Sequence, residues 1–115
     1  MLKDDWIYVG HMLEMGEKAL ELVSGKDRNT YDQDETLKLA LTHLVQVIGE
    51  AANQVSEGFR EVHQEIPWLE IIGMRNRIVH DYMNVDEDVI WEVVQQDLSA
   101  LVEVLSRVVP PEVQG

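Results

Sequence analysis

Apolar side chains recur at spacings of three and four residues along most of this chain of 115 residues. Because an α-helix turns once every ~3.6 residues, that spacing places them on one helix face. Four such stripes predict long helices at about 1–24, 33–55, 67–81 and 87–108. A short helix is expected after Ser56, and no β pattern of convincing length is present. The sequence therefore predicts an all-α, antiparallel four- to five-helix bundle with shallow crossing angles.

Residues typical of helix ends mark the boundaries between these stripes. Residues 25–31 are polar and are predicted to form a loop, since Gly25 is typical of a helix C-terminus. Asp32, with Glu35 three residues later, offers an N-cap for the second helix. Asp86 offers one for the last helix, which a pair of prolines ends. These signals leave only short connections between the helices.

Two small-residue positions indicate where helices approach closely. Gly16 falls within the first apolar stripe, and Gly49-Glu50-Ala51-Ala52 forms a small patch in the second helix. A glycine costs helix propensity but lets the backbone of another helix come near. We therefore expect helix contacts at both places.

Length and composition favour one domain, residues 1–115, with a single core. A chain this short leaves little room for a deep pocket, so an active site is expected in a groove or between subunits. The absence of cysteine excludes disulfides and thiol nucleophiles. No apolar run approaches the ~20 residues that span a bilayer. We expect a soluble, cytoplasmic protein with no membrane partner.

The formal net charge is −13. An acidic surface repels phosphate backbones at long range, which argues against broad electrostatic capture of nucleic acid. Contact with RNA would have to rest on a local basic spot. The same charge suits docking to a basic partner, and it could also restrict the access of RNA to a cleft.

One polar cluster stands out from this helical pattern. Two guanidiniums, an amide, an imidazole and a phenol fall within eight residues, in Arg75, Asn76, Arg77, His80 and Tyr82. A histidine can take a proton from a ribose 2′-hydroxyl or give one to a leaving 5′-oxygen. An arginine can bind the phosphate and offset developing charge, while an asparagine positions an oxygen. Such a set supports metal-independent RNA cleavage with a 2′,3′-cyclic phosphate product.

Spacing alone does not bring the whole cluster together. Asn76 and His80 are four apart and would share a helix face, but Arg75 lies about 140° from His80 on an ideal helix. The two meet only if the helix end unwinds or if two subunits face each other. One histidine is also a poor match for a two-proton mechanism, whereas a dimer would supply two. A structural alternative has both arginines in salt bridges, His80 at a helix C-terminus and Tyr82 partly buried.

Other polar residues are weaker candidates. Glu50 could pair with Arg75 or Arg77 and orient it, or form a purely structural salt bridge. Asp81 either tunes the site or is a solvated carboxylate. No paired histidine spacing supports a metal site, and a lone His63 is expected to be exposed or packed on a helix. The three tryptophans are expected in the core or a dimer interface: Trp6, Trp68 and Trp91.

The stretch Arg75-Asn76-x-x-x-His80-x-Tyr82 resembles the Arg-x4-His-x-Tyr signature of HepT-like toxins of the HEPN superfamily. Residues 48–52 resemble the Gly-Glu-Ala segment of that family, and residues 66–76 its Pro-Trp and Gly-Met-Arg-Asn run. Tyr82, Val85-Asp86 and Trp91 continue in the expected order. The resemblance covers nearly the whole chain.

The resemblance implies an all-helical homodimer that cleaves RNA as a toxin, with the motif in the cleft between subunits. Arg75 and His80 map to the catalytic pair, and Asn76 to the polar position after the arginine. The implied partner is a small nucleotidyltransferase, the MNT antitoxin, which transfers AMP from ATP to Tyr82. No metal or other cofactor is implied for the toxin. Two alternatives remain: a non-catalytic substrate-binding or regulatory subunit of a nucleotidyltransferase, and a helical dimer whose motif is a salt-bridge network.

Overall fold

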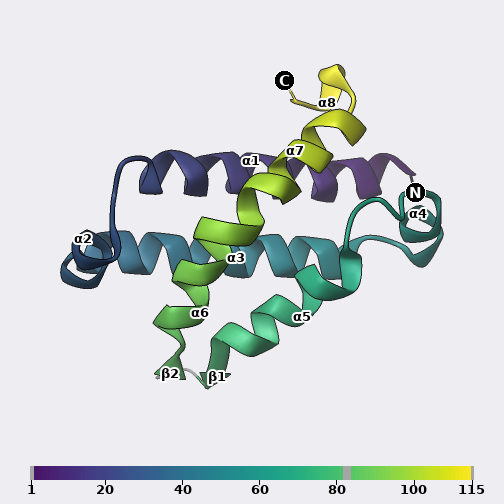
Figure 1. Cartoon of the computed structure of the whole chain (residues 1–115). Coiled ribbons are helices and arrows are strands. Elements are labelled where there is room, and N and C mark those ends of the chain that lie inside the picture. The colour runs from purple at the N-terminus through teal and green to yellow at the C-terminus, as the bar shows by residue number, and fades with distance from the viewer. Residues whose placement is uncertain (1, 82–83, 115) are drawn as a thin grey trace.

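The computed structural model describes residues 2–81 and 84–114, and the surroundings of the side chains of residues 4–78 and 85–114. Helices dominate these residues (Figure 1). The elements are α1 (Leu2–Val23), α2 (Arg28–Gln33), α3 (Glu35–Gln54), α4 (Glu57–Val62), α5 (Trp68–Ile78), β1 (Val79–Asp81), β2 (Asn84–Val85), α6 (Glu87–Glu92), η1 (Val93–Asp97), α7 (Leu98–Val108) and α8 (Pro111–Gln114). The predicted all-α class is therefore confirmed, with four long helical segments and three short ones in the described residues.

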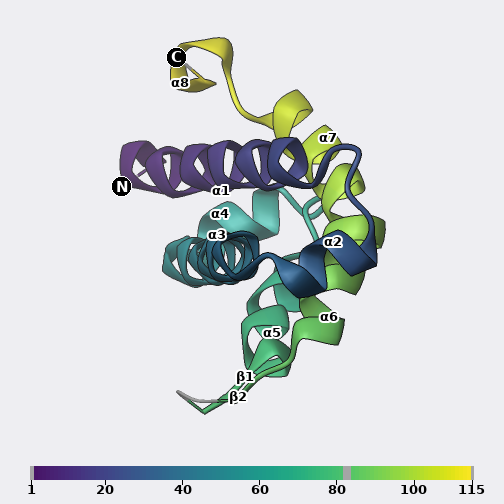
Figure 2. The same ribbon diagram turned by 90° about the vertical axis from the view of Figure 1, so that its left-hand side faces the viewer.

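The two longest helices, α1 and α3, lie side by side and run in opposite directions (Figures 1 and 2). α5 packs against α3, and α7 packs against α1. The α6–η1–α7 segment crosses α1 obliquely, so the predicted shallow angles hold for the first helix pair and not for this one. A Cβ on Gly16 would lie 2.8 Å from Val102 Cγ2. The missing side chain therefore permits the close approach of α7 that the sequence predicted.

Aspartate and serine caps set the helix starts. Asp34, not Asp32, caps α3 by accepting from the backbone N–H of Leu37 at 3.0 Å. The predicted caps at Ser56 and Asp86 are confirmed for α4 and α6. The prediction of a loop over residues 25–31 is wrong in its second half, because α2 begins at Arg28. Asp27 accepts from the N–H of Thr30, which caps α2 and lowers the pKa of this carboxyl.

The predicted third helix stops earlier than expected. α5 ends at Ile78 instead of residue 81, and Val79–Asp81 pairs antiparallel with Asn84–Val85. Val79 is paired in register with Val85, and Asp81 with Asn84. The N–H of Asp86 donates to the carbonyl of Ile78 at 2.8 Å, satisfying a carbonyl that the helix leaves open. The two strands have three and two residues, so this hairpin was not predicted and yet agrees with the absence of a β pattern of convincing length.

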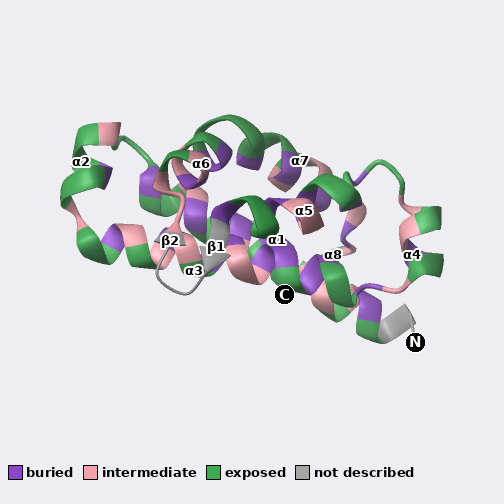
Figure 3. Ribbon diagram, turned by 90° about the horizontal axis from the view of Figure 1, so that it is seen from below, coloured by how far each residue is buried: buried purple, intermediate pink, exposed green. Residues whose placement is uncertain are grey.

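The last helix follows the predicted range, with one irregularity. A π-helical turn, η1, separates α6 from α7, while the segment continues without a break. Its buried side chains continue the apolar stripe into one core that runs through all the long helices (Figure 3). Among the described residues, no helix has both the length and the hydrophobicity to cross a membrane.

Candidate functional site

The close packing of α3 and α5 places Arg75 next to the second helix. A Cβ on Gly49 would lie 3.2 Å from Arg75 Cβ and 3.4 Å from the carbonyl oxygen of Ile71. A side chain at position 49 would require Arg75 to shift by a few tenths of an ångström. The small-residue patch predicted from the sequence therefore fixes where Arg75 leaves the helix surface.

Glu50, the next residue on α3, pairs with Arg75. Its Oε1 lies 3.4 Å from Arg75 Nε, and the two side chains are 59% and 49% exposed. The prediction that Glu50 pairs with one of the arginines is thereby confirmed for Arg75. Nε is the guanidinium nitrogen nearest the aliphatic part of the side chain, so this contact does not involve the two terminal nitrogens, Nη1 and Nη2. An ion pair this exposed stabilises the fold by ~1 kcal/mol or less, so its main effect is on the orientation of Arg75.

Arg75 and Asn76 open onto a shared polar hollow of about 430 Å³. Among the described residues, its walls come from α3 and α5. Its lining residues are Gly49, Glu50, Asn53, Gln54, Ile72, Arg75 and Asn76. Asn53 and Gln54 were not predicted as part of the site. Helical spacing could have predicted them, because they follow Glu50 by three and four residues and so share its helix face.

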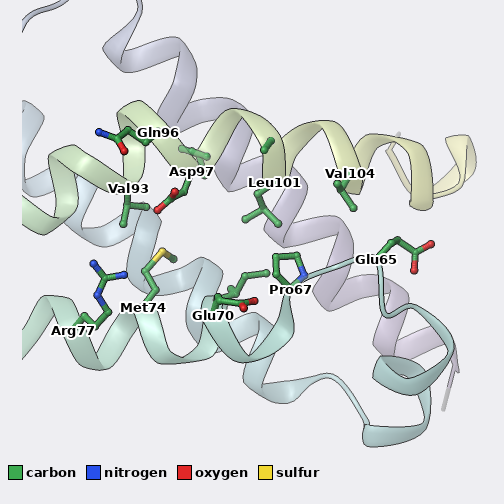
Figure 4. Close-up of a pocket in the computed structure, with 13 residues that line it drawn as sticks. Glu65, Pro67, Glu70, Met74, Arg77, Val93, Gln96, Asp97, Leu101 and Val104 are labelled. Carbon is green, nitrogen blue, oxygen red and sulfur yellow. The ribbon is translucent and has the colours of Figure 1, made fainter.

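Arg77 does not join this hollow. Arg77 follows Arg75 by two positions, which is about 200° around a helix. Arg77 instead lines a groove between α5 and the η1–α7 segment, together with Met74 and Asp97 (Figure 4). A single chain therefore places the two arginines on different sides of α5. The supporting role of Arg77 stays a prediction.

The second half of the motif lies beyond α5. His80 and Asp81 belong to β1, so the prediction that Asn76 and His80 share a helix face is wrong. The helix ends two residues too early for an i, i+4 pair. Tyr82 lies outside the described residues, as do the side chains of His80 and Asp81. The predicted site is thus split by the chain: an arginine and an asparagine on a helix, followed by a histidine on a strand.

The other candidates are structural. Trp68 is buried, and its Nε1–H donates to the carbonyl of His63 at 3.0 Å. The His63 ring packs on Phe59 at 4.4 Å and on Trp6 at 5.4 Å between centroids. The expectation of a helix-packed histidine is confirmed. Trp91 packs on Tyr31 with centroids 5.0 Å apart, which ties α6 to α2.

Comparison with known proteins places the chain in a family. The model of the family described as "Ribonuclease HepT-like" matches residues 12–108. "Putative RNase TTE0752" of Caldanaerobacter subterraneus subsp. tengcongensis is 31% identical over 105 residues, which cover 91% of this chain and 94% of that protein. "Probable ribonuclease HepT" of Thermococcus cleftensis is 32% identical over 93 residues, covering 77% of this chain and 84% of that protein.

No solved structure gives a significant match to this chain. The family match runs from the second half of α1 to the end of α7, and includes α3 and α5, which pack together and hold Arg75 and Asn76. This chain belongs to the HepT-like ribonuclease family.

Proposed function

We propose that this protein is the toxin of a HepT/MNT-type toxin–antitoxin system and a metal-independent endoribonuclease. The observation that carries the proposal is the polar hollow, where Arg75 and Asn76 lie side by side and Glu50 orients the guanidinium. An accessible guanidinium next to an amide is suited to a phosphodiester. The names of the relatives point to the same substrate class.

The proposed reaction uses the chemistry of the RNA itself. His80 takes the proton of a ribose 2′-hydroxyl, and the 2′-oxygen forms a bond to phosphorus. The bond from phosphorus to the 5′-oxygen breaks, and this oxygen receives a proton as it leaves. Arg75 offsets the charge that develops on the phosphate oxygens, and Asn76 orients one of them. The products are a 2′,3′-cyclic phosphate and a free 5′-hydroxyl.

A homodimer supplies what one chain lacks. The reaction needs one group to accept a proton and another to donate one, while the motif holds a single histidine. Two motifs that face each other provide two His80 side chains and two Arg75 guanidiniums in one cleft. The hollow is open, and its described lining residues lie on α3 and α5 of one chain, which leaves room for a second copy to cover it. Asp81 would lie at the same cleft, next to His80 in the chain.

Tyr82 is the proposed site of control. It follows His80 by two residues, so an AMP group attached to its hydroxyl would place a bulky anion near the histidine. That anion would occupy the position of the substrate phosphate and pair with Arg75. The enzyme that attaches it would be the nucleotidyltransferase antitoxin. The competing assignment, a non-catalytic regulatory subunit of such a transferase, shares the partner but not the cleavage.

RNA cleavage by the purified, unmodified protein tests the assignment. We expect Arg75→Ala and His80→Ala each to lower the cleavage rate by ~100-fold or more, since each removes transition-state stabilisation. Arg107→Ala is the matched control, because Arg107 is an exposed arginine on α7 away from the hollow. If wild type and both motif variants are equally inert but still bind the transferase, the result supports the regulatory-subunit assignment instead.

Mass spectrometry tests the role of Tyr82. Incubation with the partner transferase and ATP should raise the intact mass in steps of one AMP and abolish cleavage. Tyr82→Phe should prevent the mass shift, whereas Tyr8→Phe should leave it, since Tyr8 packs against the core in α1. An active transferase that adds nothing to the wild-type protein would contradict this role.

A further inference from the structure

A second groove, separate from the polar hollow, runs between α5 and the η1–α7 segment (Figure 4). It has a volume of about 430 Å³. On one wall its lining residues follow helical spacing from Pro67, just before α5, through Ile71 and Met74 to Arg77, a length of about 15 Å at ~1.5 Å per residue. On the opposite wall Val93, Asp97, Leu101 and Val104 follow the same spacing. Two parallel helical stripes with a gap between them are the form of a site that accepts a third helix.

The groove has an apolar floor and an acidic rim. Edges of Met74 and Leu101 line the floor, and the exposed carboxylates of Glu65, Glu70 and Asp97 stand around it (Figure 4). In the part of the chain that the structure describes, none of these three carboxylates has a cationic side chain within 4.0 Å. Arg77 is the single cation among the lining residues. The groove therefore carries three negative charges against one positive charge.

This charge pattern selects the occupant. Three carboxylates repel the phosphates of RNA, which makes this groove a poor continuation of the proposed RNA site. A second copy of the chain carries the same formal net charge of −13, so its acidic surface matches this rim less well than a basic helix does. A helix with an apolar face and flanking lysines or arginines matches both the floor and the rim.

We infer that this groove binds a cationic amphipathic helix of a partner protein. The apolar face of that helix lies on Met74 and Leu101, and its basic side chains pair with Glu70 and Asp97 across the rim. The π-helical turn contributes directly, because Val93, Gln96 and Asp97 of η1 all line the groove. π-turns are rare and often lie at functional sites. Asp97 makes no side-chain cap bond to α7, so the helix does not engage its carboxylate there. The inference does not depend on the ribonuclease assignment.

Three labelled peptides of about 18 residues, or five helical turns, test it by fluorescence anisotropy with the full-length protein. One carries leucine and lysine in an amphipathic helical pattern. The second has glutamate in place of lysine, and the third has serine in place of leucine. We expect only the first to bind, with an affinity that falls as salt rises. Equal binding of all three peptides would overturn the proposal.

Protein variants locate the binding. The double variant Glu70→Lys/Asp97→Lys should weaken binding of the cationic peptide by about tenfold or more, because it replaces two attractions with two repulsions. Glu14→Lys/Glu17→Lys makes the same charge change on exposed positions of α1 and should change it by less than about twofold at physiological salt. Ala100→Glu adds a carboxylate to the rim and should strengthen binding, a gain that misfolding cannot produce.

Three results would overturn the assignment. The first is an equal loss in both double lysine variants, which would indicate general attraction to an acidic surface. The second is displacement of the peptide by a single-stranded RNA oligonucleotide. The third is loss of self-association in Glu70→Lys/Asp97→Lys, measured by sedimentation equilibrium, which would make the groove an interface between copies of this chain.

Discussion

The Arg75–Glu50 pair carries two opposed electrostatic effects at the proposed site. Glu50 orients the guanidinium through Nε, and its own negative charge lies at the edge of the hollow where a phosphate would bind. The first effect favours the transition state. The second repels the substrate in the ground state. We regard Glu50 as a positioning residue, because it acts through Arg75.

Glu50→Gln separates the two effects. The substitution keeps the shape of the side chain and removes its charge, so KM for RNA should fall as the repulsion is lost. The value of kcat should fall by about twofold to fivefold, the equivalent of an exposed ion pair of ~0.4–1 kcal/mol. Steady-state cleavage kinetics measure both, with Glu103→Gln on α7 as a charge-matched control. An unchanged kcat would mean that Glu50 is only a surface partner of Arg75.

Sequence reasoning found half of this site for physical reasons. Glu50, Arg75 and Asn76 lie on regular helices, where spacing predicts direction, and Gly49 marks the contact between those helices. The same rule applied to Arg77 would have placed it on the opposite side of α5. The position of His80 could not be predicted in this way, because helical spacing applies only up to the end of α5. The helix ends at Ile78, whose carbonyl accepts from the N–H of Asp86 in the hairpin.

α2 is a helix in a polar segment that has no apolar stripe to predict it. Arg28–Gln33 has no apolar stripe, so the sequence favoured a loop, yet an N-cap at Asp27 and one buried anchor suffice to hold it. The anchor is Tyr31, which is fully buried against Trp91, while Arg28 bonds to Asp88 at 2.6 Å. The helix is thus formed by its docking on α6, a long-range contact that local periodicity does not encode.

Tyr31→Phe should stabilise the protein. The buried hydroxyl has no hydrogen-bond partner among the described residues, and leaving such a group unpaired costs about 1–3 kcal/mol. Burial, with the nearby Glu87 carboxylate, raises the pKa of Tyr31 to about 12 from an ordinary 10.0. In the wild type, the contribution of Tyr31 titration leaves the free energy of unfolding unchanged below pH ~10. It lowers that free energy as pH rises toward 12, because in this interval only the unfolded chain releases the proton.

Urea denaturation at several pH values measures this effect. The free energy of unfolding of Tyr31→Phe should exceed that of wild type at pH 7 by ~1 kcal/mol and should lose the part of the alkaline decline that Tyr31 causes. Tyr8→Phe serves as the control, since Tyr8 is only partly buried. A less stable Tyr31→Phe would mean that the hydroxyl is bonded in solution.

The hairpin and the π-helical turn escaped prediction for a common reason. Both interrupt a helical pattern that the sequence continues: apolar spacing runs through Ile78 and Val79, and again through Val93 and Val94. In each case a contact between elements decides the backbone. β2 pairs with β1 after α5, and η1 packs against both α1 and α6. The stripes predict which face is buried, and tertiary packing selects the local helix type.

At the scale of the whole molecule, the chain brings few positive charges to a surface of net charge −13. Among the described residues of one chain, Arg75 is the one cation that lines the hollow, since Arg77 lines the other groove. A cleft between two copies would double the cationic charge and the number of histidines without adding any residue to the sequence. The proposed dimer therefore follows from the needs of the proposed chemistry.

A composite site makes a quantitative prediction for mixed dimers. If both motifs serve a single cleft, a dimer with one inactive chain is inactive, and activity follows the square of the wild-type fraction. Random mixing of wild-type chains with an equal amount of Arg75→Ala/His80→Ala chains should then leave about one quarter of the activity. Two independent sites would leave one half. Co-expression with two different tags, followed by isolation of the doubly tagged dimer, measures the hybrid directly. Hybrids with Arg107→Ala should retain full activity. A motif-variant hybrid with half the wild-type activity would show that each chain holds a complete site, and the composite cleft would be wrong.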